Sequence, residues 1–489
     1  MPNLPMGECA ATFLLTTALA AAQSFSPAIP IAWEDTATSS FELPLAQADR
    51  SPRYLSASEY YAMPVRPVYR TYPFYLAEKE PAGYWESLQQ KEPEVLFDPA
   101  KLATKEDWIR AGELVFDQPI VIVPPSSRQH FLDHAREVPA PVTAEGIVPG
   151  WFYLVRRKGV VELGFGACAE CHTRAMPDGT FGKGAQSNFP LGRGFAWRAT
   201  HAAGTPSDAR PSSGRLFESR EAAPWAPNQE DWSKITTEEV IRRLQAQPPG
   251  VQNREGASLR HPVKIPSLIG LEDSHYLDAT GLGRHRNVAD LMRYVIVNQG
   301  LISGARYGDY VSKSRPQGGN TRYSDEQLYA LSLYVYSLRP PKNPNPVNEE
   351  AKRGQLVFQR QGCHNCHPAP LYTNNKLTPA KGFRVPDALR KTDDILDVSV
   401  GTDPGLALET RRGTGFYKVP SLRGVWMRTA LGHEGQASGL EEWLDPGRLQ
   451  PDYVPRGFHL SPGPIQGHEF GLTLSPADRR ALIAFLNTI

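Results

Sequence analysis

The sequence predicts a mainly α-helical protein in which one helical unit occurs twice in tandem, the first copy being enlarged by loops and a β-hairpin. Two observations support this prediction. The pentapeptides CAECH (168–172) and CHNCH (363–367) contain four of the five cysteines in a chain of 489 residues. The tripeptide PSL follows each of them, at 266–268 and 420–422, and a segment with helical periodicity then ends each copy.

Each copy is predicted to begin and end on a helix. AGELVF (111–116) precedes the first pentapeptide, and RGQLVF (353–358) precedes the second. The closing segments are SDEQLYALSLYVYSL (324–338) and SPADRRALIAFLNTI (475–489). Both start on a serine that can cap a helix, with acidic residues in the first turn. Each unit is therefore predicted to run as helix, pentapeptide, long loop, PSL turn, helix and closing helix.

The two copies are predicted to be separate domains. The linker RPPKNPNPVN (339–348) contains four prolines and cannot continue a helix. We therefore expect a first domain at 105–338 and a second at 349–489. The first copy carries two insertions. One is rich in Gly, Pro, Trp and Arg; the other contains WFYLVRRKGVVELGFG, which predicts a β-hairpin turning at Lys158 and Gly159.

The N-terminus is predicted to be a secretion signal. An apolar run from Ala10 to Ala22 is too short to span a bilayer and ends in small residues suited to cleavage. We expect a signal peptide at residues 1–22, and a periplasmic or secreted protein with no transmembrane helix. A buried N-terminal helix is the alternative. Residues 23–104, rich in Pro and Tyr, are expected to form an arm packed over the domains.

The charge balance gives no reason to expect a nucleic-acid partner. The formal net charge is +1 and the isoelectric point is about 7.7. A protein that binds nucleic acid or an anionic membrane surface through its overall charge would be more basic.

The two pentapeptides fit three kinds of site. A CxxC pair can be half of a zinc site, a redox dithiol or the attachment point of a covalent haem. Only the haem interpretation uses the histidine that follows directly, because that residue becomes the proximal iron ligand. We therefore expect two covalently bound haem c groups. The attachment cysteines and proximal histidines would be Cys168, Cys171 and His172 in the first copy and Cys363, Cys366 and His367 in the second.

The tandem CxxCH units and the motifs that follow them resemble those of a known family. Two CxxCH units in tandem, the second followed by KVPSLRGV (418–425) and HEG (433–435), resemble the bacterial di-haem cytochrome c peroxidase superfamily. That superfamily includes the enzyme that matures tryptophan tryptophylquinone and the di-haem rubber oxygenases. The resemblance covers about residues 105–489, and the enlarged first domain is more similar to the rubber-oxygenase branch.

The resemblance implies a fold and a function. Both domains would be cytochrome c-like, with first and last helices that cross to seat the haem. The N-terminal haem would react with H2O2 or O2, and the C-terminal haem would relay electrons from small redox proteins or quinol-linked donors. The alternative is a non-catalytic electron-transfer cytochrome with two six-coordinate haems.

The sixth ligand of the C-terminal iron is less obvious than the fifth. Relay haems of the peroxidases take a methionine after the PSL turn, but SGLEEWLDPGRL (438–449) has none. His468, in the loop before the last helix, is the preferred candidate. His433 and Tyr453 are alternatives, and Met427 is expected to be a buried filler.

The distal side of the first haem is not marked in the sequence. The absence of a histidine shortly after CAECH favours an open position on that iron. The histidines that remain candidates are His201, His275 and His285. The candidate acid–base side chains for moving a proton during peroxide cleavage are Glu162, Gln299 and His275. Trp197 is expected to pack on a porphyrin edge, with electron transfer between the haems as the alternative, and Tyr294 is expected to be a core residue.

Overall fold

The mainly α prediction is wrong: the chain folds into a mixed α and β protein. The computed structural model describes residues 25–36, 40–201, 223, 225–226, 231, 234–253, 258–298, 303–311 and 321–489. The structure is 35% helical, and its described strands form six sheets in which every pair is antiparallel. The sequence-based expectation failed because many strands are only two or three residues long and too short to show a period of two. The expected signal peptide, Cys9 and Gln299 lie outside the described residues.

Three groups of elements follow one another along the chain. The N-terminal arm contains β1 (Pro52–Tyr54), α2 (Ala57–Ala62), β2 (Thr71–Tyr75) and α3 (Tyr84–Gln89). The first half continues with α4 (Lys105–Asp117), β3 (Val121–Val123), α5 (Arg128–Glu137), β4 (Ile147–Arg157), β5 (Val160–Phe165), α6 (Cys168–His172), β6 (Thr173–Ala175), β7 (Phe181–Lys183), α7 (Leu191–Thr200), α9 (Thr237–Gln245), β8 (Val251–Gln252), β9 (Val263–Lys264), β10 (Tyr276–Leu277), β11 (Gly283–Arg284), α10 (Val288–Asn298), β12 (Ser303–Tyr307), β13 (Tyr310–Val311) and α11 (Asp325–Ser337). The second half contains α12 (Glu349–Arg360), β14 (Leu377–Pro379), α13 (Asp387–Thr392), α14 (Gly405–Leu408), β15 (Phe416–Lys418), α15 (Leu440–Trp443) and α16 (Pro476–Leu486).

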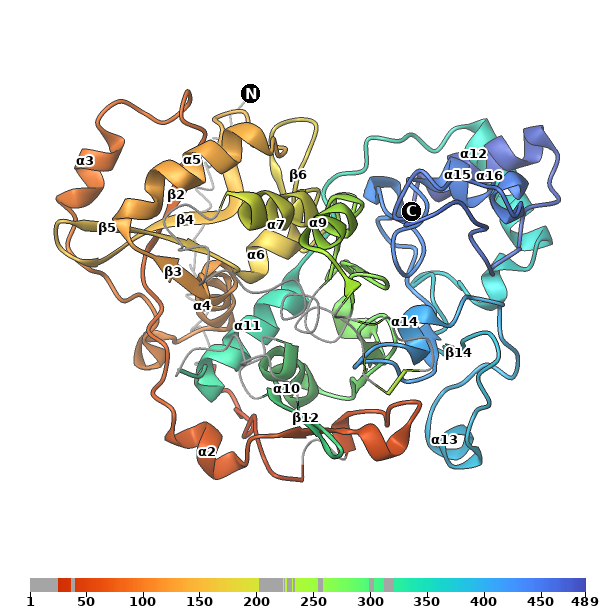
Figure 1. Cartoon of the computed structure of the whole chain (residues 1–489), viewed down its shortest axis with the longest axis horizontal. Coiled ribbons are helices and arrows are strands. Elements are labelled where there is room, and N and C mark those ends of the chain that lie inside the picture. Colours follow the sequence, from red (N-terminus) through yellow and green to blue (C-terminus); the bar gives the residue numbers. More distant parts are fainter. Residues whose placement is uncertain are drawn as a thin grey trace, which may run out of the picture.

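In each half the first helix packs against the last one. Helix α4 crosses α11, and α12 crosses α16, which lies beside it at the blue end of the chain in Figure 1. A glycine sits at each crossing: a Cβ on Gly112 would overlap the carbonyl oxygen of Ala330, and one on Gly354 would overlap that of Ala481. The backbones therefore approach more closely than any side chain at these positions would allow. The predicted domain boundary at 339–348 falls between the two helix pairs and stays a prediction.

The predicted β-hairpin is part of a larger sheet. Strands β4 and β5 pair around a turn that includes Gly159, whose φ of +79° suits glycine. The full strand order is β2-β4-β5-β3. Strand β2 comes from the N-terminal arm, and its Pro73 is tolerated because β2 is an edge strand.

The arm is also part of the core rather than a cover laid over finished domains. Trp33 and Phe41, which are 2% and 1% exposed, pack in the same hydrophobic cluster as residues of α4, α10 and α11. Strand β1 pairs with β12, far along the chain. The first half therefore cannot complete its core without the arm.

Charged contacts join the two halves. Arg423, directly after the second PSL tripeptide, donates to the carbonyl oxygen of Gly270 at 3.0 Å and pairs with Asp273 at 2.8 Å. Arg284 of β11 pairs with Asp393 at 2.7 Å. The segments that follow the two PSL turns are thus in direct contact. Within the part of the chain that the structure describes, no helix is both long and apolar enough to cross a membrane.

The helix crossing in the second half gives a first prediction. The substitution Gly354→Ala should lower the free energy of unfolding by about 1–3 kcal/mol, because the new methyl group must displace the α16 backbone. Urea unfolding followed by circular dichroism measures the effect. Gly463→Ala is the matched control, because nothing lies within 4 Å of a Cβ at that position. An equal loss in both variants would contradict a specific role for the crossing.

Candidate functional site

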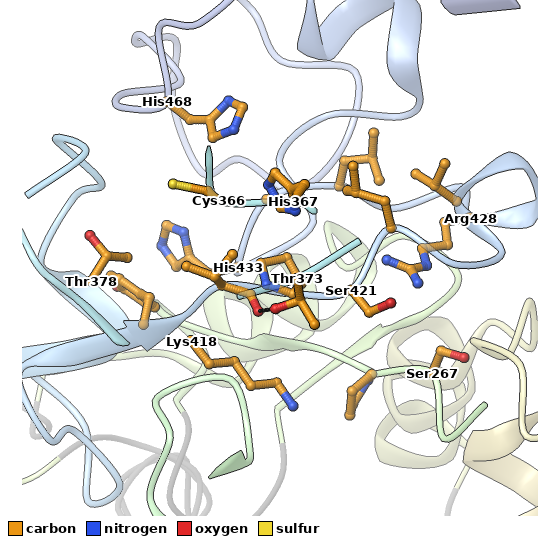
Figure 2. Close-up of a pocket in the computed structure, with 18 of the residues that line it drawn as sticks. Ser267, Cys366, His367, Thr373, Thr378, Lys418, Ser421, Arg428, His433 and His468 are labelled. Atoms are coloured by element: carbon orange, nitrogen blue, oxygen red, sulfur yellow. Dashed lines mark hydrogen bonds between the residues drawn. The ribbon is translucent and has the colours of Figure 1, made fainter. Parts of the chain in front are cut away.

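The candidate site is an apolar cavity of about 460 Å³ that both halves of the chain line. The first half contributes residues 264–267 around the first PSL turn. The second half contributes Cys363, Cys366 and His367 of the second pentapeptide, together with His468 (Figure 2). Phe358 of α12 and Leu482 of α16 also line it, so the helix crossing forms part of the wall.

The orientation of His367 is fixed by two backbone carbonyl groups. Its ring is buried, with the residue 8% exposed, and Nδ1 lies 3.0 Å from the carbonyl oxygen of Tyr372. Burial lowers the pKa of His367, while hydrogen bonds to backbone at Tyr372 and Pro420 act in the opposite direction. With Nδ1 engaged, Nε2 is the nitrogen left to bind a metal.

The cysteines beside His367 are not reactive thiolates. Burial raises the pKa of Cys363 to about 11 and also raises that of Cys366. A redox dithiol needs a cysteine with a lowered pKa, so this environment does not support a thioredoxin-like role. In the described part of the chain, the cysteines also form no group of three or more metal-ligating side chains.

His468 faces His367 across the cavity. The ring centroids are 6.4 Å apart. Two hydrogen bonds from Arg448 hold the loop, one to the carbonyl oxygen of Gly467 at 2.9 Å and one to that of His468 at 2.8 Å. His468 itself has a left-handed φ of +50°, a backbone conformation that costs energy for any residue except glycine. Burial, followed by the nearby His367 and Arg448, lowers the pKa of His468 to about 4, so the imidazole is neutral.

Three half-buried cationic side chains line the same cavity. Burial lowers the pKa of Lys264 to about 7, that of Lys418 to about 8 and that of Arg428 to about 10. No aspartate or glutamate is among the described residues that line the cavity, and Nε of Arg428 has no hydrogen-bond partner. Asp278, which does not line the cavity, partly offsets the charge of Lys418. Cations with little access to water are costly, so the cavity is suited to a group that carries negative charge.

The first pentapeptide forms α6, next to the same cavity. His172 is 9% exposed, and its Nδ1 lies 3.1 Å from the carbonyl oxygen of Pro266 in the first PSL turn. Pro266 also lines the cavity that contains His367 and His468. One residue therefore contacts the histidine of the first pentapeptide and forms part of the wall of the second site.

The glutamate within CAECH, Glu170 of α6, is buried and hydrogen-bonded. Glu170 accepts hydrogen bonds from Nε1 of Trp151 at 3.1 Å and from the backbone N–H of Gly166 at 2.7 Å. Burial raises the pKa of this carboxyl group. Trp151 packs on His134, whose two ring nitrogens are buried without hydrogen-bond partners.

The other candidates for the C-terminal iron have partners of their own, although His433 also lines the cavity. His433 lies 3.0 Å from a carboxylate oxygen of Asp403, and Tyr453 donates to Glu442 at 2.8 Å. Met427 is buried in the hydrophobic core. Of the four residues considered, the structure brings only His468 opposite His367.

The candidates for the first haem site are scattered. Both ring nitrogens of His285 are engaged, with the carbonyl oxygen of Ser274 at 2.7 Å and the hydroxyl group of Tyr336 at 2.6 Å. The remaining candidates and their contacts are His201 stacked on Trp197, His275 paired with Asp394, Glu162 paired with Arg156, and Tyr294 donating to Asp278.

Sequence reasoning missed the three cations, although two of them carried a signal. Lys264 and Lys418 each stand two positions before the proline of PSL, so the repeated motif is K-x-P-S-L. The same lysine at the same place in both copies could have indicated an anion-binding role. Arg428 occurs in only one copy, and nothing in the sequence distinguished it.

His134 gives a prediction of pH dependence. Its pKa is lowered from 6.5 to about 4 by burial, so the unfolded chain binds the proton more tightly than the folded one. The contribution of neutral His134 to the free energy of unfolding is fully present above pH 6.5 and is lost as the pH falls towards 4. Between pH 7 and pH 5 the native chain should lose about 2 kcal/mol more than His134→Leu, measured by urea unfolding.

The exposed His201 supplies the control for this experiment. The variant His201→Leu should keep the pH dependence of the native chain, because its ring is half exposed. If His134→Leu has the same pH dependence as the native chain, His134 is not the buried neutral group that the structure describes.

Comparisons with known proteins give weak similarities only. No family model matches the chain, and no curated protein matches it. Among solved structures, hydrazine synthase of Kuenenia stuttgartiensis is similar at 15% identity and a TM-score of 0.30, over 56% of this chain and 86% of that one. The diheme peroxidase BthA of Burkholderia thailandensis is similar at 15% identity and a TM-score of 0.26, over 81% of this chain and 90% of that one. TM-scores this low do not establish a shared fold.

Proposed function

We propose that the protein is a periplasmic di-haem c-type oxidoreductase. The haem held by the first half would react with H2O2 or O2, and the haem held by the second half would relay electrons to it. The observation that carries this proposal is the pair of facing histidines, His367 and His468, in a cavity that also contains the two cysteines of CHNCH.

The distance between these histidines fits one shared metal ion. Imidazole nitrogens bind transition metals at about 2.0 Å, so two rings on opposite sides of one ion have centroids about 6 Å apart. The observed separation is 6.4 Å. His367 would supply the fifth ligand and His468 the sixth, while Cys363 and Cys366 would hold the porphyrin through thioether bonds.

The half-buried cations fit the remaining polar groups of a haem. A porphyrin is apolar except for its two propionate groups, which are anionic. Lys264, Lys418 and Arg428 would bind these groups, and no carboxylate side chain lines the described cavity to compete with the propionates. The apolar wall, with Phe358 and Leu482 among its residues, would contact the ring face. When bound, haem supplies one-electron transfer and the reduction of a small oxidant.

A second haem would be held by Cys168, Cys171 and His172. Its open position is supported by the engagement of His285, whose two ring nitrogens both have partners. His275 and His201 are bound to other side chains at exposed positions. The first haem would therefore be the reactive one, as the resemblance to the di-haem peroxidase superfamily also implies.

A residue shared by the two sites supports a relay between them. Pro266 accepts from the ring of His172 and lines the cavity of the second site. Arg423 further fixes the two PSL segments to each other. Electrons would enter at the C-terminal haem from small redox proteins or quinol-linked donors.

Haem content and ligand binding test the proposal. The full chain, produced with periplasmic cytochrome maturation, should contain two haems by pyridine haemochrome assay, and its Soret absorbance should resist extraction by acidified acetone. Replacing both cysteines of either pentapeptide by alanine should leave one haem. The ferrous protein should bind CO at one haem only.

Two outcomes would overturn parts of this proposal. A chain without Soret absorbance would eliminate haem and restore the zinc interpretation. Two six-coordinate, low-spin haems that do not respond to peroxide, CO or O2 would instead support a non-catalytic electron-transfer cytochrome.

His468 provides a separate test of the relay site. Since its φ is left-handed, His468→Gly should preserve the loop and remove the sixth ligand, converting the C-terminal haem to high spin in electron paramagnetic resonance. Added imidazole should restore the low-spin spectrum. His459→Gly, which removes a ring that hydrogen-bonds to the carbonyl oxygen of Gly457, is the control. An unchanged spectrum in His468→Gly would exclude His468 as a ligand.

A further inference from the structure

A second group of metal-ligating side chains lies outside the haem ligands. Oxygen or nitrogen atoms of Asp403, His433 and Glu434 all lie within 4.8 Å of one another. Nε2 of His433 is 3.0 Å from an oxygen of Asp403 and 3.7 Å from an oxygen of Glu434. Tyr417 packs on the imidazole, with ring centroids 4.5 Å apart, and limits its movement.

These separations match the edges of a metal coordination sphere. Ligand atoms that bind one ion at about 2.1 Å are about 3.0–3.4 Å apart at neighbouring octahedral or tetrahedral positions. The side chains of His433 and Asp403 already have this spacing, the His433–Glu434 separation of 3.7 Å is a few tenths of an ångström longer, and the carboxylate oxygens of Asp403 and Glu434 lie within 4.8 Å of each other. The ligand atoms are therefore close to the arrangement that an ion requires.

An outer pair of side chains fixes Glu434. Nδ1 of His261 lies 2.7 Å from the same Glu434 oxygen that faces His433, and the other nitrogen of His261 is 3.3 Å from an oxygen of Glu409 without a hydrogen bond. A Cβ on Gly405 would overlap the His261 ring, so this glycine leaves room for the imidazole. A histidine that orients a ligating carboxylate is typical of metal sites.

The charges of the cluster favour a bound cation. Three carboxylates and two imidazoles gather with little exposure to solvent: the side chains of Glu434 and His433 are each 9% exposed and that of Glu409 is 12% exposed. Asp403, at 25%, gives a route from solvent. Around them Gln436 and the ring of Tyr417 are neutral. Even with both imidazoles protonated, the carboxylates are in excess by one.

We propose that Asp403, His433 and Glu434 bind one divalent first-row transition-metal ion, of the Zn²⁺ or Mn²⁺ class, with His261 as the positioning residue. Imidazole favours zinc and its neighbours over Mg²⁺ or Ca²⁺, and two carboxylates with one imidazole leave positions for water. The site contains none of the residues that are proposed to bind haem iron, His172, His367 and His468.

The ion would tie the two halves of the chain together beside the haem cavity. His261 belongs to the first half and its carboxylate partners to the second. His433 also lines the cavity, and its carbonyl oxygen accepts from the backbone N–H of Lys264 at 2.9 Å. Loss of the ion would loosen a wall that both halves share.

Metal analysis of the full holoprotein tests the proposal. The chelated and desalted protein is loaded with Zn²⁺ at pH 7, desalted again and measured by inductively coupled plasma mass spectrometry against protein concentration. We expect about one Zn²⁺ per chain, displaced protons on binding in weak buffer, and a higher unfolding temperature. The isosteric variants Asp403→Asn and Glu434→Gln should each lower occupancy at least tenfold, whereas Glu441→Gln, at an exposed position, should not.

The outcomes are separable. His261→Gln should weaken Zn²⁺ binding by about 10–100-fold without abolishing it, as expected for a positioning residue. Wild-type protein that retains less than 0.1 Zn²⁺ per chain would overturn the proposal, even if the variants fail to fold. Full occupancy in Asp403→Asn, or selective binding of Ca²⁺ in place of Zn²⁺, would also overturn it.

Discussion

The rest of the structure depends on the close crossing of two pairs of helices at glycine. Gly112 lets α4 approach α11, and Gly354 lets α12 approach α16. Each crossing joins segments separated by a hundred or more residues, so it closes a long stretch of chain into one unit. In the second half, side chains from both helices of the pair line the cavity. The position of the CxxCH histidine relative to that wall is therefore set by backbone contact rather than by the length of any side chain.

The helices of this framework could be predicted from the sequence, and most of the strands could not. The capping serines and apolar periodicity of 324–338 and 475–489 are strong local signals, and Ser324 and Ser475 do accept the expected capping bonds. Strands of two or three residues have no period to detect, and the pairing of β1 with β12 depends on tertiary packing. The contribution of the arm to the core could not be predicted for the same reason, because the burial of Trp33 follows from distant partners.

The site shows the same division between local motif and distant geometry. The proximal histidines follow from CxxCH alone, and His468 was preferred because loops before a closing helix can reach the opposite wall. Its facing position, 6.4 Å from His367 between ring centroids, needed the structure. The cluster of Asp403, His433 and Glu434 could not be predicted as a site, because His261 joins it from the other half of the chain. What the sequence offered at His433 was only a short turn motif.

The dual contact of Pro266 has a consequence for mutational studies. Its carbonyl oxygen holds the ring of His172, and the residue is also part of the wall that faces His367. A substitution there acts on both sites at once, so its effect should not add to those of mutations in either site. A double-mutant cycle that combines Pro266 with a residue of either site should therefore give a coupling energy different from zero. Spectral changes at one site are thus not proof that the mutated group belongs to that site.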